Sequence, residues 1–495
     1  MKQRCSEVLA FLKKRKLTVI LFLVTFTAFL IWLASRGSMT DGSGDAQDIW
    51  KTITSYYSGD IYPSYVLYKG FVSVYPYVWL YQLAVLFGTN EFFFVMVYHA
   101  LLFTYITVIG LPNFIKYLFD YEPKWWQRIL IIPLLYLIWD KTGALSQLMV
   151  DLPSCAIFML AINSAIKIEN KTGIKRVLSS LYLGFIACLG ASVSGQYSVA
   201  MVCVIIFALV KLIPLKVLKD KTKRGSALLC VLLLIVGAAI VKLLGYWFDS
   251  TVMKSFEEQG VTFLSGQFWL NRGLLYMMDK SRLFYGPTIV SQRGFEIVAK
   301  HYGGAEQAKA AIEAAGMGGS TWGVLEYLKM VLHYPFDYIC LYVDKFFACI
   351  SIDFQRNSIA GLTLSYTAIY LALYSAMRYT KKAKNFFNAR FWLVIGCLLT
   401  VLPNLALCVE MRCEISLHCL LFGTAILGPV LPDIFGEFIA GIKLWHKEKT
   451  IKCLGEKKFP WGLIFYVIFV LICIAHYGAM LAQSGLGENT LFNLF

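Results

Sequence analysis

Three aspartates follow directly on an apolar run that is long enough to cross a bilayer. The run is LTVILFLVTFTAFLIWLA, and the stretch after it, GSMTDGSGDAQDIW, contains Asp41, Asp45 and Asp48. A carboxylate at a membrane surface can act as a general base that takes the proton of a hydroxyl nucleophile. Acids are also favoured at helix starts, so Asp45 is either a base or an N-cap. We take Asp45 as the first candidate for the base and Asp48 as the second.

A fourth acid stands at the start of a later apolar run. In LSQLMVDLPSCAIFMLAINSAI, Asp151 lies at the outer mouth of an expected membrane helix. An ionisable group in this position is costly unless it is solvated or paired, which makes Asp151 a candidate for function. The structural alternative is an N-cap with Pro153 in the first turn. The predicted catalytic set is Asp45, Asp48 and Asp151.

A cation that could bind a phosphate lies in CVEMRCEISLH, between two late apolar runs. The planar guanidinium of Arg412 suits bidentate binding of phosphate, with Glu410 beside it. An ion pair of Arg412 with Glu410 or Glu414, stabilising a tight loop, explains these residues equally well. The other candidates for substrate binding are Lys69, Arg272, Arg282 and His333.

The composition identifies the elements that must position these groups. Of the 495 residues, 58% are hydrophobic and 16% aromatic, and the mean hydropathy is +0.63, above what the core of a soluble protein needs. The net charge of +16 does not indicate nucleic acid binding, because most Lys and Arg fall in short segments between apolar runs. We therefore predict an all-α polytopic membrane protein whose partner is the lipid bilayer and no nucleic acid.

The short basic segments also predict the topology, because such loops stay cytoplasmic. They imply a plasma (cytoplasmic) membrane protein with about eleven transmembrane helices, its N-terminus cytoplasmic and its C-terminus outside. The expected spans lie near residues 17–35, 91–112, 129–145, 149–166, 177–193, 197–213, 226–246, 359–377, 391–409, 413–432 and 461–482.

The spans and loops divide the chain into three parts. Residues 1–246 form an N-terminal transmembrane half whose first outer loop, 36–90, carries the acidic motif. Residues 247–358 form an outer-face loop, and residues 359–495 the C-terminal transmembrane helices. Both outer loops contain helix patterns too polar to cross, such as PFDYICLYVDKFFACI, which we expect to lie in the membrane interface. In the second loop, GAEQAKAAIEAAGMGGS predicts one soluble helix that Gly316 closes.

The order of these features resembles that of the membrane glycosyltransferases of the GT-C fold, the superfamily of protein mannosyltransferases and bacterial cell-envelope aminoarabinose transferases. Its members run from a first span to an acidic motif, an interfacial helix, a Tyr-Pro stretch and a segment ending in LFG. Here GDAQDIW, SVYPYVWLYQLAVLFG and NEFFFVMVYHALLF occupy those places. Asp151 matches a second acidic motif of such proteins. The D-x-x-D spacing departs from the adjacent Asp-Glu of many members, which leaves the choice between Asp45 and Asp48 open.

The resemblance implies a GT-C-like fold and a glycosyltransferase. Such an enzyme would move a sugar from a polyprenyl-phosphate-linked donor to a cell-envelope glycan or glycolipid acceptor on the outer face. Asp45 or Asp48 would be the base, and Arg412 with Arg272 or Arg282 would hold the phosphate. No cofactor is predicted, no metal-ligand spacing is found, and a divalent metal could still bind through Asp48 and Asp151.

Two other functions fit a polytopic chain of this kind. An O-antigen-type polysaccharide polymerase also has a large outer loop, but arginines of that loop should dominate its site. A lipid or solute transporter should show broken helices and charges at the middle of the bilayer. The acids of this chain lie mostly at helix ends, which favours an enzyme at the outer surface over a transporter.

Overall fold

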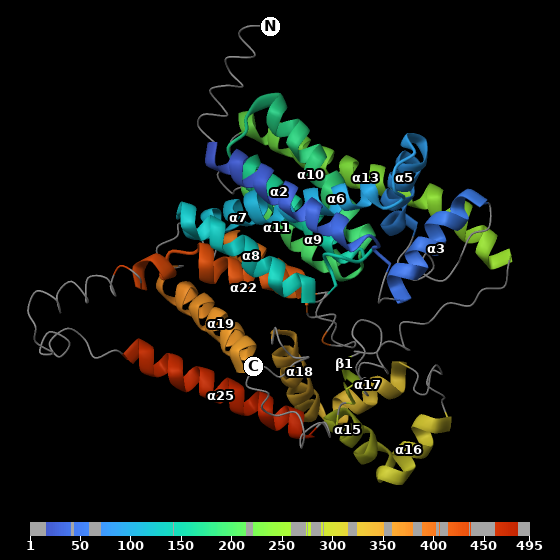
Figure 1. The fold of residues 1–495 in the computed structure, drawn as a ribbon, viewed down its shortest axis with the longest axis vertical. Coiled ribbons are helices and arrows are strands. Elements are labelled where there is room, and N and C mark those ends of the chain that lie inside the picture. The colour runs from blue at the N-terminus through green and yellow to red at the C-terminus, as the bar shows by residue number, and fades with distance from the viewer. Residues whose placement is uncertain are drawn as a thin grey trace, which may run out of the picture. The chain divides into compact units, whose positions relative to one another are not determined.

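The computed structural model shows a helical protein whose chain divides into two compact units (Figure 1). Within the described residues, the exception to the predicted all-α class is one small antiparallel sheet of β1 (Tyr276–Met278) and β2 (Ile289–Val290). The described residues are 16–40, 44–58, 71–141, 143–213, 221–258, 274, 276–278, 289–290, 292–314, 324–350, 359–379, 389–401, 405, 414–434, 436 and 461–483.

The first unit contains residues 1–263, 383–400 and 415–420. Its helices pack as one bundle, in which α9 is surrounded by α6, α7, α10 and α11. The helices are α2 (Lys16–Arg36), α3 (Gly44–Ser58), α5 (Phe71–Phe87), α6 (Phe93–Thr104), the π-helical turn η1 (Tyr105–Gly110), α7 (Leu111–Phe119), α8 (Trp125–Lys141), α9 (Asp151–Ile168), α10 (Gly173–Val193), α11 (Gln196–Leu212), α13 (Lys221–Glu258), α20 (Phe391–Leu399) and the start of α22 (Ile415–Leu427).

The second unit contains residues 264–382, 401–414 and 421–495. It includes the small sheet and the end of α22. Its other helices are α15 (Gln292–Tyr302), α16 (Ala305–Ala314), α17 (Val324–His333), α18 (Pro335–Ile350), α19 (Ile359–Tyr379) and α25 (Trp461–Gln483).

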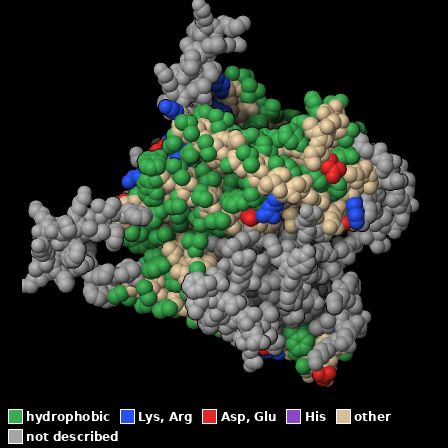
Figure 2. Space-filling model, viewed as in Figure 1, with side chains coloured by type: hydrophobic (Ala, Val, Ile, Leu, Met, Phe, Trp, Pro, Cys, Tyr) green, Lys and Arg blue, Asp and Glu red, His purple; other side chains and the backbone are tan. Residues whose placement is uncertain are grey.

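Six helices of the described chain are long and apolar enough to cross a membrane, so the membrane class is supported. Large apolar side chains such as Leu23, Ile31 and Leu243 are exposed, and Figure 2 shows hydrophobic side chains over much of the visible surface. Each of the eleven predicted spans overlaps a helix. Their number stays a prediction, because several of these helices are shorter than a full span. The six are Lys16–Arg36, Phe93–Phe119, Asp151–Ile168, Gly173–Val193, Arg224–Trp247 and Ile415–Ile434.

Helix α5 departs from the sequence analysis. The predicted outer loop 36–90 was expected to hold helices too polar to cross, yet α5 has no charged residue and is apolar over Val72–Phe87. Trp79, Leu86 and other large side chains of α5 are exposed. An exposed apolar helix needs an apolar neighbour, so α5 belongs with the membrane-contacting helices and α3 alone fits the polar description.

One end of the first unit gathers the loops that were predicted to be cytoplasmic. Nζ of Lys211, in the last turn of α11, lies 2.9 Å from Oε1 of Glu169, just after α9. The hydroxyl of Tyr117 on α7 also donates to Glu169, at 3.3 Å. Arg390, just before α20, lies 2.8 Å from the carboxylate of Asp120, after α7. Four segments that the positive-inside pattern places on one side therefore meet at one end, which we name the basic end.

The opposite end joins segments that were predicted to lie outside. Arg36 ends α2 and forms an ion pair with Asp140 near the end of α8, at 3.0 Å. The backbone N–H of Leu148 donates to the carbonyl oxygen of Met39 at 2.8 Å. We name this the acidic end, because the stretches that carry Asp48 and Asp151 are found there.

Two exposed asparagines in turns test which end is cytoplasmic. Asn90 precedes α6 at the acidic end, and Asn170 follows α9 at the basic end. A membrane-impermeant thiol reagent is expected to label Asn90→Cys on intact cells and Asn170→Cys only after permeabilisation. The unsubstituted protein gives the background of native cysteines. Labelling of Asn170→Cys on intact cells would reverse the predicted orientation.

The span Phe93–Phe119 changes helix type in its middle, at the turn η1. A π-helical turn accommodates one more residue than an α-helical turn and leaves the hydrogen-bond ladder interrupted. Nδ2 of Asn163 on α9 donates to the carbonyl oxygens of Gly110, at 3.0 Å, and Met159, at 2.8 Å. The side chain of Asn163 thus satisfies a carbonyl at the end of the π turn and connects it to α9.

Helices α10 and α13 approach each other through two glycines. A Cβ atom on Gly184 would lie 1.9 Å from the carbonyl oxygen of Leu234, and one on Gly237 would lie 2.1 Å from that of Leu181. Real Cβ atoms do not come this close to backbone atoms. Small residues allow membrane helices to pack at short range in this manner, and the two glycines make the contact reciprocal.

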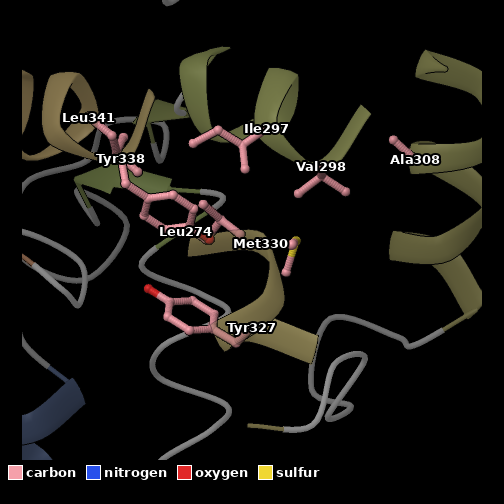
Figure 3. Packing of buried hydrophobic residues seen from close by; sticks show 8 residues of the cluster. All are labelled: Leu274, Ile297, Val298, Ala308, Tyr327, Met330, Tyr338 and Leu341. Carbon is pink, nitrogen blue, oxygen red and sulfur yellow. The ribbon is translucent and has the colours of Figure 1, made fainter. Parts of the chain in front are cut away.

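The predicted outer loop 247–358 includes a small helical subdomain of the second unit, built from α15 to α18. The expected soluble helix is α16, and the helix of PFDYICLYVDKFFACI is α18 with the predicted bounds; Gly316 lies outside the described residues. Figure 3 shows the core that these helices share. It consists of Leu274, Ile297, Val298, Ala308, Tyr327, Met330, Tyr338 and Leu341.

Ion pairs hold the charged residues of α18. Asp344 is buried and accepts a hydrogen bond from Nε of Arg293 at 2.8 Å, while Nε2 of His476 on α25 lies 3.3 Å from its other oxygen. Burial alone would lower the pKa of Arg293, but the hydrogen bond to Asp344 raises it above its ordinary value. Nζ of Lys300 donates to Asp337 at 2.7 Å, and this bond raises the pKa of Lys300. Because their charges are paired, Asp337 and Asp344 are accommodated in the otherwise largely apolar helix α18.

Candidate functional site

The helix that carries the acidic cluster is amphipathic, as predicted. Ala46, Ile49 and Ile53 of α3 are buried, and α3 packs against α5 (Figure 1). The helix begins at Gly44, so Asp45 lies in its first turn and the predicted N-cap role of Asp45 is wrong. Asp48 follows three residues later and is half-buried. Both acids are near the helix N-terminus, where the macrodipole stabilises a negative charge.

An aromatic residue fixes α3 in place. The ring of Trp50 lies 5.3 Å from that of Tyr81 on α5, edge to face, and 4.4 Å from that of Phe92, which precedes α6. Such pairs contribute about 0.5–1.5 kcal/mol beyond the area they bury. The acidic helix is thus attached to the hairpin of α5 and α6.

Asp151 is the first residue of α9 and is almost fully buried. The N-cap is Val150, so the expected N-cap role of Asp151 is also wrong, whereas Pro153 does lie in the first turn as expected. A buried carboxylate needs polar or charged neighbours, since an isolated one would not stay ionised. The buried carboxylate of Asp151 therefore needs the polar groups that surround it.

Polar groups gather on the face of α9 that Asp151 begins. Cys155 is one turn further along α9, and the hydroxyl of Ser416 at the start of α22 donates to its Sγ at 3.7 Å. The hydroxyl of Tyr197 on α11 lies 2.8 Å from Oγ of Ser416. Helices α9, α11 and α22 thus bring hydroxyl and thiol groups together one turn along α9 from Asp151.

A second network holds the loop that leads into Asp151. The hydroxyl of Tyr77 on α5 donates to the carbonyl oxygen of Met149 at 2.5 Å and lies 3.1 Å from Nε2 of His99 on α6. Nδ1 of His99 lies 3.2 Å from the carbonyl oxygen of Leu145. All these side chains are buried. Residues 145 to 150 are therefore fixed from α5 and α6, the hairpin against which α3 rests.

Tyr77→Phe is expected to destabilise this loop. The substitution keeps the ring but removes the hydroxyl and its hydrogen bond to the buried carbonyl of Met149, a loss of about 0.5–1.5 kcal/mol. The unfolding temperature of the purified protein should fall. Tyr98→Phe is the control, because the Tyr98 hydroxyl makes none of these contacts. Equal unfolding temperatures for Tyr77→Phe and the wild type would show that the loop is held by other groups.

Most of the predicted substrate-binding residues lie outside the described residues. His333 is described: it ends α17 in the second unit, is exposed, and its Nδ1 donates to the carbonyl oxygen of Lys329 at 2.8 Å. Glu414, the alternative partner of Arg412, is buried just before α22. Outside the described residues are Asp41, Lys69, Arg272, Arg282, Glu410 and Arg412.

The sequence analysis missed the residues that hold the loop before Asp151 and the polar groups one turn along α9 from it. His99 is a core histidine with a hydrogen-bonding neighbour at each ring nitrogen, and the sequence analysis did not single it out. Tyr77 was read as part of a Tyr-Pro stretch, and Tyr197 and Ser416 were not singled out. Polar residues inside otherwise apolar helices are the signal that could have identified them.

Asp48 and Asp151 do not belong to a cluster that could bind a metal within the part of the chain that is described. No group of three or more His, Cys, Asp or Glu side chains in metal-binding proximity is found there. A shallow apolar groove does run along α5, past Trp79, Gln82 and Leu86. The described acids do not line it, so it is separate from the acidic site.

Comparison with known proteins identifies no relative of this chain: no family model, no curated protein and no solved structure matches it. The functional assignment therefore depends on the residues and their arrangement.

Proposed function

We propose that this protein is an integral membrane glycosyltransferase. It moves a sugar from a polyprenyl-phosphate donor to a glycan or glycolipid acceptor of the cell envelope, on the outer face of the membrane. The proposal combines the resemblance of the sequence to GT-C transferases with the arrangement of the acids in the first unit.

The observation that supports it most is the placement of both acidic stretches at the end opposite the basic loops. The segment before α3 contains Met39, whose carbonyl oxygen accepts a hydrogen bond from the backbone N–H of Leu148. Helix α5 packs against α3, and Tyr77 of α5 donates a hydrogen bond to the carbonyl oxygen of Met149. Asp151 follows two residues after Met149. A transferase that uses a lipid-linked donor needs carboxylates near the membrane surface where the acceptor arrives, and the position of both acidic stretches at one end of the unit supports the proposal.

The reaction requires three kinds of group. Asp45 or Asp48, which form the predicted catalytic set together with Asp151, takes the proton of the acceptor hydroxyl as its oxygen bonds to the anomeric carbon. The bond from that carbon to the phosphate oxygen breaks, and the polyprenyl phosphate leaves with the electron pair. Cations stabilise the charge that develops on this phosphate, a role that we assign to Arg412 with Arg272 or Arg282.

The direct test is an assay with purified protein in lipid vesicles. A polyprenyl phosphate carrying a radiolabelled sugar is incubated with the protein and a cell-envelope glycolipid fraction. We expect release of polyprenyl phosphate together with one labelled sugar per acceptor. Long labelled chains on the lipid carrier would indicate the polymerase, and movement of label across the vesicle without bond cleavage would indicate the transporter. Either result would contradict the proposed transferase function and support the corresponding alternative.

A further inference from the structure

Helices α17 and α18 expose a continuous line of large apolar side chains. Their spacing of three or four residues places them on one side of each helix. Helices at a protein surface normally direct such a stripe inward and leave polar residues outside. The exposed fractions are Leu325 77%, Leu328 48%, Leu332 77%, Phe336 76%, Ile339 58% and Val343 41%.

The exposed apolar residues are not part of the hydrophobic core of the subdomain, because the core residues lie on the other sides of the same two helices. Tyr327 and Met330 of α17 and Tyr338 and Leu341 of α18 are buried, and Figure 3 shows them in the cluster with α15. The two helices are therefore apolar on two sides. The exposed side needs an apolar environment that the subdomain does not supply.

The rest of the subdomain has a polar surface. The exposed residues of α15 and α16 include Glu296, Lys300, Glu306 and Gln307, and among the side chains of these two helices that the structure describes no large hydrophobic one is exposed. The subdomain thus has a polar side formed by α15 and α16 and an apolar side formed by α17 and α18. This sidedness is typical of a structure that lies at a boundary between water and an apolar phase.

Charged groups flank the apolar line without interrupting it. Lys329 and His333 are exposed on α17, beside Leu325 and Leu332. Nζ of Lys329 lies 3.1 Å from Glu326, and hydrogen bonds from His301 and then Lys329 lower the pKa of Glu326. Basic groups at the rim of an apolar face suit a surface of lipid phosphates.

The apolar line also continues towards a helix that is itself apolar. The ring of Phe347 on α18 lies 4.5 Å from that of His476 on α25, which also contacts Asp344. Helix α25 is an apolar helix that exposes Leu471 and Ile472. The end of α18 is therefore attached to a helix whose exposed face already requires lipid.

We propose that the face formed by Leu325, Leu328, Leu332, Phe336, Ile339 and Val343 rests in the lipid bilayer. Helices α17 and α18 then form an interfacial hairpin that extends the membrane contact of α25, with α15 and α16 on the aqueous side. This contact does not depend on the sugar-transfer chemistry. It also extends the interfacial placement expected for α18 to α17 and names the face that inserts.

The test uses the full-length protein in vesicles of phosphatidylglycerol and phosphatidylethanolamine that contain a doxyl-labelled lipid. An environment-sensitive NBD fluorophore is attached at Leu332→Cys or Phe336→Cys. The matched control is Ala310→Cys, on the polar surface of α16. The unsubstituted protein, treated in parallel, gives the contribution of native cysteines.

We expect blue-shifted emission that the doxyl lipid quenches at Leu332→Cys and Phe336→Cys, and neither effect at Ala310→Cys. Blue-shifted emission without quenching would mean that protein covers the face, either a second copy or another part of the chain, and would overturn the proposal. Unshifted emission would place the face in water and overturn it as well. Quenching at all three positions would contradict the assigned sidedness.

Discussion

Asp151→Asn is expected to reduce sugar transfer by about 10²–10⁴-fold, the usual contribution of an acid–base group. The amide has nearly the shape of the carboxylate, so packing at the start of α9 should survive while the negative charge of this member of the predicted catalytic set is lost. Asp140→Asn is the matched control, because Asp140 lies at the same end in a partly exposed ion pair with Arg36. Such a pair is worth about 0–1 kcal/mol, so the control should transfer sugar normally.

The same substitution at Asp45 and Asp48 should have unequal effects. The one that serves as the base must reach the acceptor hydroxyl within about 2.6–3.2 Å, and its loss should match that of Asp151→Asn. Asp45 is the second residue of α3 and Asp48 the fifth, and the amide of asparagine keeps nearly the same shape at both positions. Turnover numbers for the purified variants in lipid decide the assignment. Near-normal turnover in all three variants would leave the acids with a structural role and remove the main support for the transferase.

Gly237→Ala is expected to destabilise the first unit by about 3 kcal/mol, at the upper end of the cost of overpacking. The new methyl group would meet the backbone of α10, which cannot rotate away as a side chain can. The unfolding temperature in detergent, followed by tryptophan fluorescence, should fall.

Gly245→Ala is the control within the same helix, because a Cβ atom there meets nothing within 4 Å. Alanine forms helices better than glycine by up to about 1 kcal/mol, so this variant should be as stable as the wild type or slightly more stable. If Gly237→Ala is equally stable, α10 and α13 do not pack as closely as described.

The helices themselves could be predicted because the signals for them are local. Pro335 fixes the start of α18, and the apolar run after Asp151 fixes α9, whose predicted and observed bounds differ by two residues. The alternative that Asp45 is the N-cap does not hold, because α3 already includes Gly44 before it. Residue type alone does not distinguish a cap from the first turn, since acids suit both.

The groups that position Asp151 could not be predicted, because their signals are not local. Tyr77 bonds to Met149 across 72 residues, and Tyr197 contacts Ser416 across 219 residues. The glycine contact of α10 with α13 likewise depends on which helices become neighbours, which hydrophobicity leaves undetermined. In a chain where most positions are apolar, the pattern specifies that helices cross the membrane but not which faces meet.

The π-helical turn of the span Phe93–Phe119 limits how this helix can change in length. Each residue of an α-helix advances the side-chain direction by about 100°. The extra residue within Tyr105–Gly110 therefore sets the angle between α6, which carries His99, and α7, which follows Gly110. Deletion of one residue there would restore regular α-helical bonding and yet rotate Gly110 away from Asn163. Relatives of this chain should therefore keep both the number of residues between His99 and Gly110 and an amide donor at the position of Asn163, even where the apolar residues between them vary.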